Sequence, residues 1–168
     1  MAPLSLQEVS DRIEIDDLLT RYATAVDTRQ WDLYSTCFTE DAFIDYTSAG
    51  GVKGQLPEVR AWLEKTMPIF PMSQHAVLNR DIRIAGDTAT CRSIFYNPMA
   101  LPGEAPRRGE VPRSGEAPRP GEESPRKLFI EGGYYNDELV RTPDGWRIRE
   151  RIEESSYSTM RSELIQPG

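Results

Sequence analysis

The sequence has few residues of the kinds that bind transition metals, with one histidine and two cysteines among 168 residues. Cys37 and Cys91 are far apart and match no zinc or redox spacing, so we expect reduced thiols, a cytoplasmic location and no metal site. We also expect no cleavable signal and no membrane span, because no apolar run is long enough to cross a bilayer. The formal net charge of -7 disfavours nucleic-acid and anionic-membrane partners, which need a basic surface.

The periodicity of the apolar residues predicts helices first and strands afterwards. With 38% hydrophobic residues, residues 1–168 are expected to form a single domain. The expected helices run from Ser5 to about Asp27, from Trp31 to about Phe38 and from Gly54 to Phe70. The expected strands are Ala42–Ser48, His75–Ile84, Thr88–Pro98, Lys127–Arg141 and Trp146–Tyr157. This order predicts an α+β domain in which a curved antiparallel sheet packs on N-terminal helices and closes a cone-shaped ligand cavity.

One segment has no features of a packed core. Residues 103–126 contain four imperfect copies of a six-residue unit that begins Gly-Glu and carries proline and arginine. Because almost no apolar side chain is present, we expect an extended or disordered loop at about 102–126, inserted between two strands.

The first expected helix ends on a carboxylate in an unusual place. Its apolar stripe is made of Ile15, Leu18, Leu19, Tyr22 and Val26. At about 100° per residue, Asp27 falls on the edge of this stripe, although the negative end of the helix dipole disfavours it there. A residue that breaks a local rule is a candidate for function. The alternative is that Asp27 caps the following helix and that Gln30 completes a capping box.

His75 is the only histidine, and it lies where a loop passes into a strand. A lone histidine is more often a surface or core residue than a catalyst. Asp27, however, lies on a helix that the sheet must cover. A carboxylate that accepts from one imidazole nitrogen makes the other nitrogen a better base, so Asp27 and His75 are the candidate catalytic pair.

Several motifs of the chain are shared with one known family. They are the spacing of Ile15, Leu18, Tyr22, Ala23, Ala25, Val26, Asp27 and Trp31, and the segments Cys37-Phe-Thr-Glu-Asp-Ala, Lys53-Gly54, Gln74-His75 and Asp144-Gly145-Trp146-Arg-Ile. In these motifs the chain resembles SnoaL-like proteins of the nuclear transport factor 2-like superfamily, which have a cystatin-like α+β barrel. The resemblance covers all but the repeats and the last few residues. Within the superfamily it is nearest to the scytalone dehydratase and hexachlorocyclohexane dehydrochlorinase group.

The resemblance implies roles for several residues. Asp27 and His75 match the catalytic pair of that group, Tyr46 matches a dehydratase tyrosine that helps to activate substrate, and Arg151 falls where the dehydrochlorinase has its active-site arginine. Other residues that polarise the substrate in those enzymes are not kept in this chain. The second histidine of the dehydratase falls near Ser93, and the active-site lysine of the dehydrochlorinase falls at Tyr22. The serine and asparagine of the dehydratase, near residues 133–135, have no clear match.

Strand alternation adds pocket candidates, each with ordinary core packing as the alternative. If Ser93 faces inward, Cys91 and Phe95 do too. Tyr134 is a candidate from the next strand, and Trp62, Phe70 and Met72 are candidates near the third helix. For Arg151 the alternative is a solvated or subunit-facing stripe shared with Arg147, Arg149 and Glu153.

Together these features predict a cofactor-independent lyase, isomerase or cyclase, in secondary or xenobiotic metabolism. His75, polarised by Asp27, would remove a carbon-bound proton from a small hydrophobic carbonyl or hydroxylated ring compound, and Tyr22, Tyr46 or Arg151 would stabilise the oxyanion. The alternatives are an isomerase whose base is a carboxylate and a non-catalytic binding or assembly module. The exposed sheet face predicts a homodimer or homotrimer.

Overall fold

The computed structural model describes residues 3–101 and 128–159, so the repeat segment lies outside the described residues. The helices are α1 (Leu6–Asp27), α2 (Trp31–Ser35) and α3 (Leu56–Thr66), with short 3-10 helices η1 (Thr47–Ala49) and η2 (Met67–Ile69). The strands are β1 (Phe38–Asp45), β2 (Lys53–Gln55), β3 (Met72–Ser73), β4 (Ala76–Ala85), β5 (Thr88–Ala100), β6 (Leu128–Thr142) and β7 (Gly145–Ser158). None of these helices is long and apolar enough to cross a membrane.

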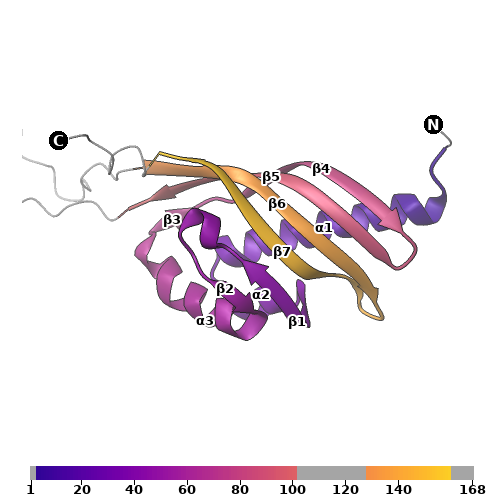
Figure 1. The fold of residues 1–168 in the computed structure, drawn as a ribbon, viewed down its shortest axis with the longest axis horizontal. Helices are drawn as coiled ribbons and strands as arrows, with labels where there is room; N and C mark the ends of the chain where they lie inside the picture. The colour runs from indigo at the N-terminus through magenta and orange to yellow at the C-terminus, as the bar shows by residue number, and fades with distance from the viewer. Residues whose placement is uncertain (1–2, 102–127, 160–168) are drawn as a thin grey trace, which may run out of the picture.

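The predicted α+β class is confirmed, with one correction to the sheet. The strand order is β2-β1-β7-β6-β5-β3, and β4 also pairs with β5. β1 runs parallel to β7, whereas every other pair is antiparallel, so the sheet is mixed. The long helix α1 lies along one face of the sheet, and α2 and α3 lie below its β1–β2 end (Figure 1). This arrangement leaves a sheltered space between α1, α3 and the inner face of the sheet.

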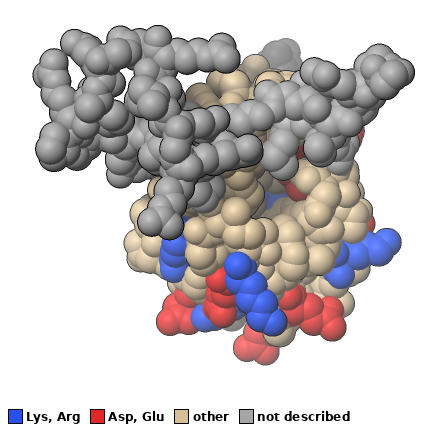
Figure 2. Space-filling view, turned by 90° about the vertical axis from the view of Figure 1, so that its left-hand side faces the viewer, with Lys and Arg blue, Asp and Glu red and all other residues tan. Residues whose placement is uncertain are grey.

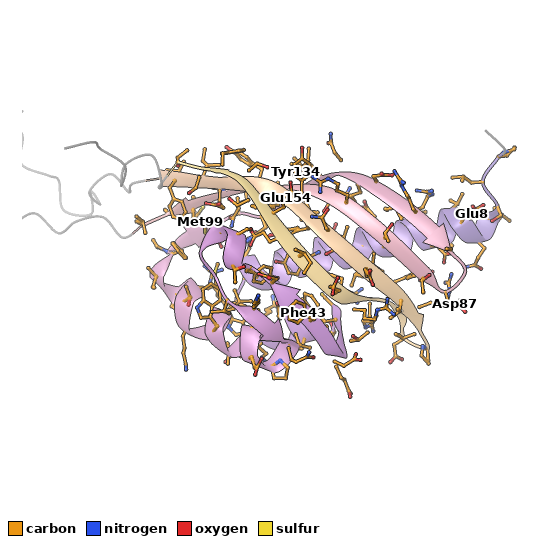
Figure 3. The ribbon with its side chains drawn as sticks, in the orientation of Figure 1. Glu8, Phe43, Asp87, Met99, Tyr134 and Glu154 are labelled. Carbon is orange, nitrogen blue, oxygen red and sulfur yellow. The ribbon has the colours of Figure 1, made fainter. Side chains whose placement is uncertain are left out.

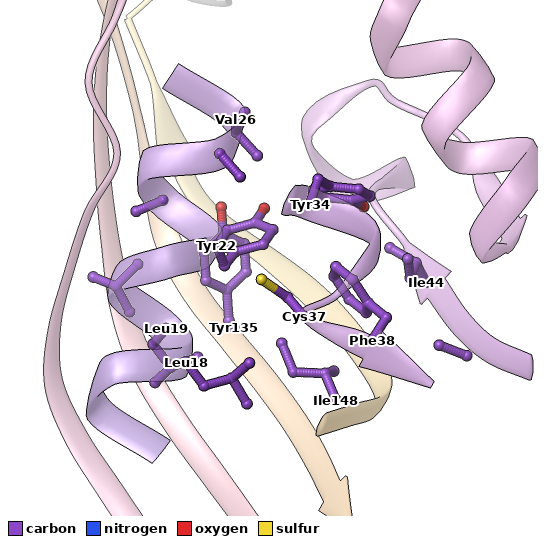
Figure 4. Close-up of a cluster of buried hydrophobic side chains, with 14 of the residues drawn as sticks. Leu18, Leu19, Tyr22, Val26, Tyr34, Cys37, Phe38, Ile44, Tyr135 and Ile148 are labelled. Carbon is purple, nitrogen blue, oxygen red and sulfur yellow. The ribbon is translucent and has the colours of Figure 1, made fainter. Parts of the chain in front are cut away.

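The helix α1 begins and packs as its sequence predicts. Ser5 and Glu8 form the capping box, with the Glu8 carboxylate 2.8 Å from the Ser5 backbone nitrogen. The buried stripe of α1 faces the sheet, where Tyr135 and Ile148 meet it, and Tyr34, Cys37 and Phe38 complete the cluster (Figure 4). These contacts fix the C-terminal end of α1, and therefore Asp27, against the sheet.

The boundaries of two predicted elements change for a common reason. The second helix ends at Ser35 and the first strand begins at Phe38, four residues before its predicted start. The Ile148 backbone nitrogen donates to the Cys37 carbonyl oxygen at 2.9 Å, so the chain joins β7 directly after α2. Sequence periodicity cannot reveal this parallel pairing, because the partner strand lies about a hundred residues further along.

A β-bulge in β7 overturns the predicted arginine stripe. Ile148 pairs with Leu139 and Glu150 pairs with Glu138, so Arg149 is an extra residue in the strand. An extra residue reverses the alternation of faces beyond it. Arg149 is consequently exposed, whereas Arg151 is fully buried on the inner face.

Candidate active site

A cavity of about 280 Å³ opens between α1, α3 and the inner face of the sheet. Its apolar wall includes Trp62, Leu63, Met67, Phe70, Met99 and Phe129. Its polar groups include Tyr22, Tyr46, His75, Asn97, Glu131 and Glu153. In Figure 2, tan residues cover the middle of the visible face, and most of the charged side chains lie along its lower edge and flanks. An apolar cavity with a few convergent polar groups is the usual form of a small-molecule site.

The structure places Asp27 and His75 in direct contact. Asp27 is the last residue of α1, and His75 immediately precedes β4. The His75 Nδ1 atom lies 2.6 Å from Asp27 Oδ1, and the His75 backbone nitrogen donates to Asp27 Oδ2 at 2.8 Å. The Ser73 hydroxyl donates to Asp27 Oδ1 at 3.0 Å. The alternative prediction, that Asp27 caps the following helix, is wrong. The N-cap of α2 is Gln30, and no side chain caps that helix.

Arg29 holds this corner of the site together. Its backbone has a φ of 61°, in the left-handed region that reverses the chain at the end of α1. Its guanidinium donates to the carbonyl oxygens of Met67 and Phe70 at 3.2 and 3.1 Å and to the Ser73 hydroxyl at 3.0 Å. The segment before β4 is therefore tied to the end of α1, which places the His75 backbone beside the carboxylate.

The hydrogen bonds around Asp27 favour its charged form. Burial works to raise the pKa of Asp27, but the ring and backbone of His75 and the Ser73 hydroxyl outweigh it and hold the pKa below its usual value. A carboxylate at Oδ1 requires a proton on His75 Nδ1, which leaves Nε2 with its lone pair. The Asn97 side-chain amide donates to this Nε2 atom at 2.9 Å.

Three tyrosine hydroxyls meet beside the cavity. The Tyr46 oxygen lies 3.0 Å from the Tyr22 oxygen and 3.4 Å from the Tyr34 oxygen. Burial raises the pKa of Tyr22 and raises that of Tyr46 well above its usual value. The hydroxyls of Tyr22 and Tyr46 therefore stay protonated and can donate hydrogen bonds to a ligand in the cavity.

Arg151 lies behind the wall of the cavity rather than in it. Its guanidinium makes two 2.7 Å bonds to Asp137 and lies 4.0 Å from the Tyr22 ring centre and 4.2 Å from the Tyr135 ring centre. Because these rings separate it from the cavity, the predicted contact of Arg151 with substrate is not available. Its side chain instead supports the two tyrosine rings.

Three other predicted pocket residues, Phe95, Tyr134 and Met72, do not line the cavity. Phe95 stacks on Tyr135 with ring centres 4.7 Å apart and is buried outside the cavity lining. Tyr134 is on the outer face of the sheet with Glu154, under the guanidinium of Arg92 at 3.8 Å (Figure 3). Trp62 and Phe70 line the cavity, whereas Met72 is exposed and does not.

The predicted site lacks several polar residues of the cavity, among them Asn97, Glu131 and Glu153. The alternation that places Ser93 and Phe95 inward also places Asn97 inward, so that signal was present. Tyr135, not Tyr134, lines the cavity, and Glu131 lies on the same face of β6 as Tyr135. A prediction that placed Tyr135 inward would therefore have included Glu131. Glu153 lies on the inner face because of the bulge at Arg149, and no local pattern of residues marks that bulge. In the described part of the chain, no group of three or more His, Cys, Asp or Glu side chains is placed to hold a metal ion.

A family model for the SnoaL-like domain matches residues 7–152. The chain belongs to the SnoaL-like family. It is 37% identical over 157 residues to the uncharacterised protein Rv2910c of Mycobacterium tuberculosis, a match that covers 94% of this chain and 93% of that one.

Two solved structures that carry the names of enzymes share the fold of this SnoaL-like protein. A hexachlorocyclohexane dehydrochlorinase, LinA-type3 from Novosphingobium barchaimii, matches with a TM-score of 0.68 and 17% identity, covering 92% of each chain. A putative scytalone dehydratase from Novosphingobium aromaticivorans matches with a TM-score of 0.65 and 18% identity, covering 90% of this chain and 88% of that one. At these identities the likeness shows the fold alone.

Proposed function

We propose that this SnoaL-like protein is a cofactor-independent lyase or isomerase that removes a carbon-bound proton from a small, neutral, largely apolar carbonyl or hydroxylated ring compound. The observation that carries the proposal is the 2.6 Å contact between Asp27 Oδ1 and His75 Nδ1 at the wall of an apolar cavity. Its fold neighbours named as a dehydrochlorinase and a putative dehydratase support the same class of chemistry.

In this mechanism Asp27 orients the base and His75 takes the proton. The carboxylate holds the proton of the ring on Nδ1, so the Nε2 lone pair accepts the proton from carbon. The bound substrate displaces the Asn97 amide from Nε2, where it lies in the structure. As negative charge develops on the substrate oxygen, the Tyr46 and Tyr22 hydroxyls donate hydrogen bonds to it.

The walls of the cavity restrict the size and charge of the substrate. A volume of about 280 Å³ suits a molecule of one or two small rings. No Lys or Arg lines it among residues 3–101 and 128–159, while two glutamates do. An anionic substrate would be repelled without compensation, so we propose a neutral one.

Deuterium uptake tests the proposed proton abstraction. When the protein is incubated in deuterated water with neutral cyclic ketones, we expect deuterium at the carbon next to the carbonyl, detected by mass spectrometry. Heat-inactivated protein is the control for the spontaneous exchange of ketones. A ligand that binds, as shown by calorimetry, but is recovered without deuterium would contradict the proposal and favour a non-catalytic binding module.

We further propose a cytoplasmic homodimer or homotrimer. Cys37 and Cys91 are both free and buried, as expected for a reducing compartment. Apolar side chains are exposed on the outer face of the sheet at Leu78, Tyr96, Leu128 and Tyr157. A second copy would cover such a face. Light scattering at micromolar concentration should give twice or three times the chain mass, and a monomer would contradict the proposal.

A further inference from the structure

Two carboxyl groups line the same cavity as His75, and their surroundings differ. Glu131 is on β6 and accepts a hydrogen bond from the Ser155 hydroxyl. Glu153 is on β7, and its partly buried carboxyl group has no hydrogen-bond partner among the described residues. A hydrogen-bond donor stabilises a carboxylate, whereas a carboxyl group without a donor is more easily kept neutral.

The groups that face Glu153 favour its neutral form. Burial is the largest cause, and the charges of Glu131 on β6 and Asp45 on β1 act in the same direction. Arg151 opposes them, but it is paired with Asp137 at 2.7 Å. Together these groups raise the pKa of Glu153 to about 8, and the neighbouring Tyr22 and Tyr135 are themselves uncharged. At neutral pH Glu153 is therefore a carboxylic acid.

The sheet places this acid across the cavity from the base. The Asn97 amide is 2.9 Å from the His75 ring, and Asn97 pairs with Glu131 on the next strand, β6. Glu153 is on β7, beyond β6, opposite Tyr135. A ligand in the cavity therefore lies between His75 on one side and Glu153 on the other.

An unsatisfied polar atom also indicates that this space receives a polar ligand. Asn97 lines the cavity and is 6% exposed, and its side-chain oxygen is buried without a hydrogen-bond partner among the described residues. Buried polar atoms are rarely left unpaired. A ligand hydroxyl lying between His75 and Glu153 would satisfy it.

We infer that Glu153 is the general acid of the site, which protonates the leaving oxygen when the proposed lyase removes water from a neutral β-hydroxy carbonyl compound. This inference rests on the proposed function. His75 Nε2 takes the proton from the carbon next to the carbonyl, and the electrons of that C–H bond form the new C=C bond. The C–O bond to the hydroxyl breaks with its electron pair on oxygen, and Glu153 gives its proton to that oxygen, so that water leaves. Solvent then returns the proton from His75 to Glu153.

The test compares two leaving groups on one ring. The probes are 3-hydroxycyclohexanone, which needs a proton to release hydroxide, and 3-chlorocyclohexanone, which releases chloride without one. Both yield the same conjugated enone, followed by its absorbance. Glu153→Gln should lower kcat for the hydroxy compound by about 100- to 10,000-fold and leave the chloro compound within a few-fold of wild type. Equal effects on both compounds, or none, would overturn the inference.

The pH profile gives a second readout with a defined sign. Wild-type dehydration should fall as pH rises through about 8, where Glu153 loses its proton. The charge of Glu131 disfavours ionisation of Glu153, so Glu131→Gln lowers the pKa of Glu153 and should move this alkaline limb to lower pH. An alkaline limb that stays in place in both Glu131→Gln and Glu153→Gln would contradict the assignment.

Failure of this inference is distinguishable from failure of the proposed function. Infrared difference spectra of wild type and Glu153→Gln without ligand should show a neutral carboxyl group at pH 7, and its absence overturns the acid role whatever the activity. Deuterium entering the hydroxy ketone without enone formation would leave His75 as the base and overturn the acid alone. If neither exchange nor enone is found with either probe, the proposed function fails and the acid role fails with it.

Discussion

The variant His75→Gln is expected to catalyse exchange of the ligand's carbon-bound protons about 100- to 10,000-fold more slowly than the wild type does. This factor is the usual contribution of a general base. Glutamine has no atom that accepts a proton at neutral pH, and no other histidine is present to replace it. The measurement is the initial rate of deuterium incorporation in deuterated water at saturating ligand, with the spontaneous rate subtracted.

Arg83→Gln is the matched control for this variant. Arg83 is on β4, the strand that follows His75, and its exposed side chain pairs with Asp81 at the surface. The control should keep the wild-type rate, and the urea midpoint of His75→Gln should show that the variant is folded. A wild-type rate in folded His75→Gln would contradict the mechanism and move the base to a carboxylate of the cavity.

The second large effect is on stability, at the ion pair behind the cavity. Asp137→Ala should lower the free energy of unfolding by about 3–5 kcal/mol, because it leaves a buried charge without a partner. Both side chains of the Arg151–Asp137 pair are 0% exposed. Denaturation in urea, followed by tryptophan fluorescence, measures the change.

The neighbouring residue provides the control. Glu138 pairs with Arg149 at 2.7 Å, but both side chains are half exposed, so Glu138→Ala should cost about 0–1 kcal/mol. The double variant Asp137→Leu with Arg151→Met removes both charges and should recover most of the stability lost in Asp137→Ala. Equal costs for Asp137→Ala and Glu138→Ala would show that the buried pair has no special role.

The elements that could be predicted from the sequence are those with strong local signals. The capping box at Ser5 and Glu8 and the apolar stripe of α1 are properties of neighbouring residues, and the structure has both. The four long strands were bounded by turns at Gly86 and Gly145, both of which have positive φ. Local chemistry therefore predicted the order of the long helices and strands and the fold class, but not the short strands β2 and β3.

The errors concern which face of a strand a residue occupies. The alternation of a strand is set by its pairing, so a single extra residue such as Arg149 reverses it, and no local signal marks that residue. The choice of Tyr134 over Tyr135 is the same kind of error, because both have the same side chain and only the register with β5 separates them. The extra residue Arg149 accounts for the missed Glu153, and the choice of Tyr134 over Tyr135 accounts for the missed Glu131.

The central claim, that Asp27 orients the base, is tested most directly by the protonation of the single histidine ring. In ¹⁵N NMR at a pH where the ring is neutral, the wild type should carry the proton on Nδ1, facing Asp27 Oδ1 at 2.6 Å. In Asp27→Asn the side-chain oxygen should stay on the His75 backbone N–H, which places the amide nitrogen against Nδ1. That amide donates, so the proton should move to Nε2. The same tautomer mixture in both proteins, as in a free imidazole, would contradict the account.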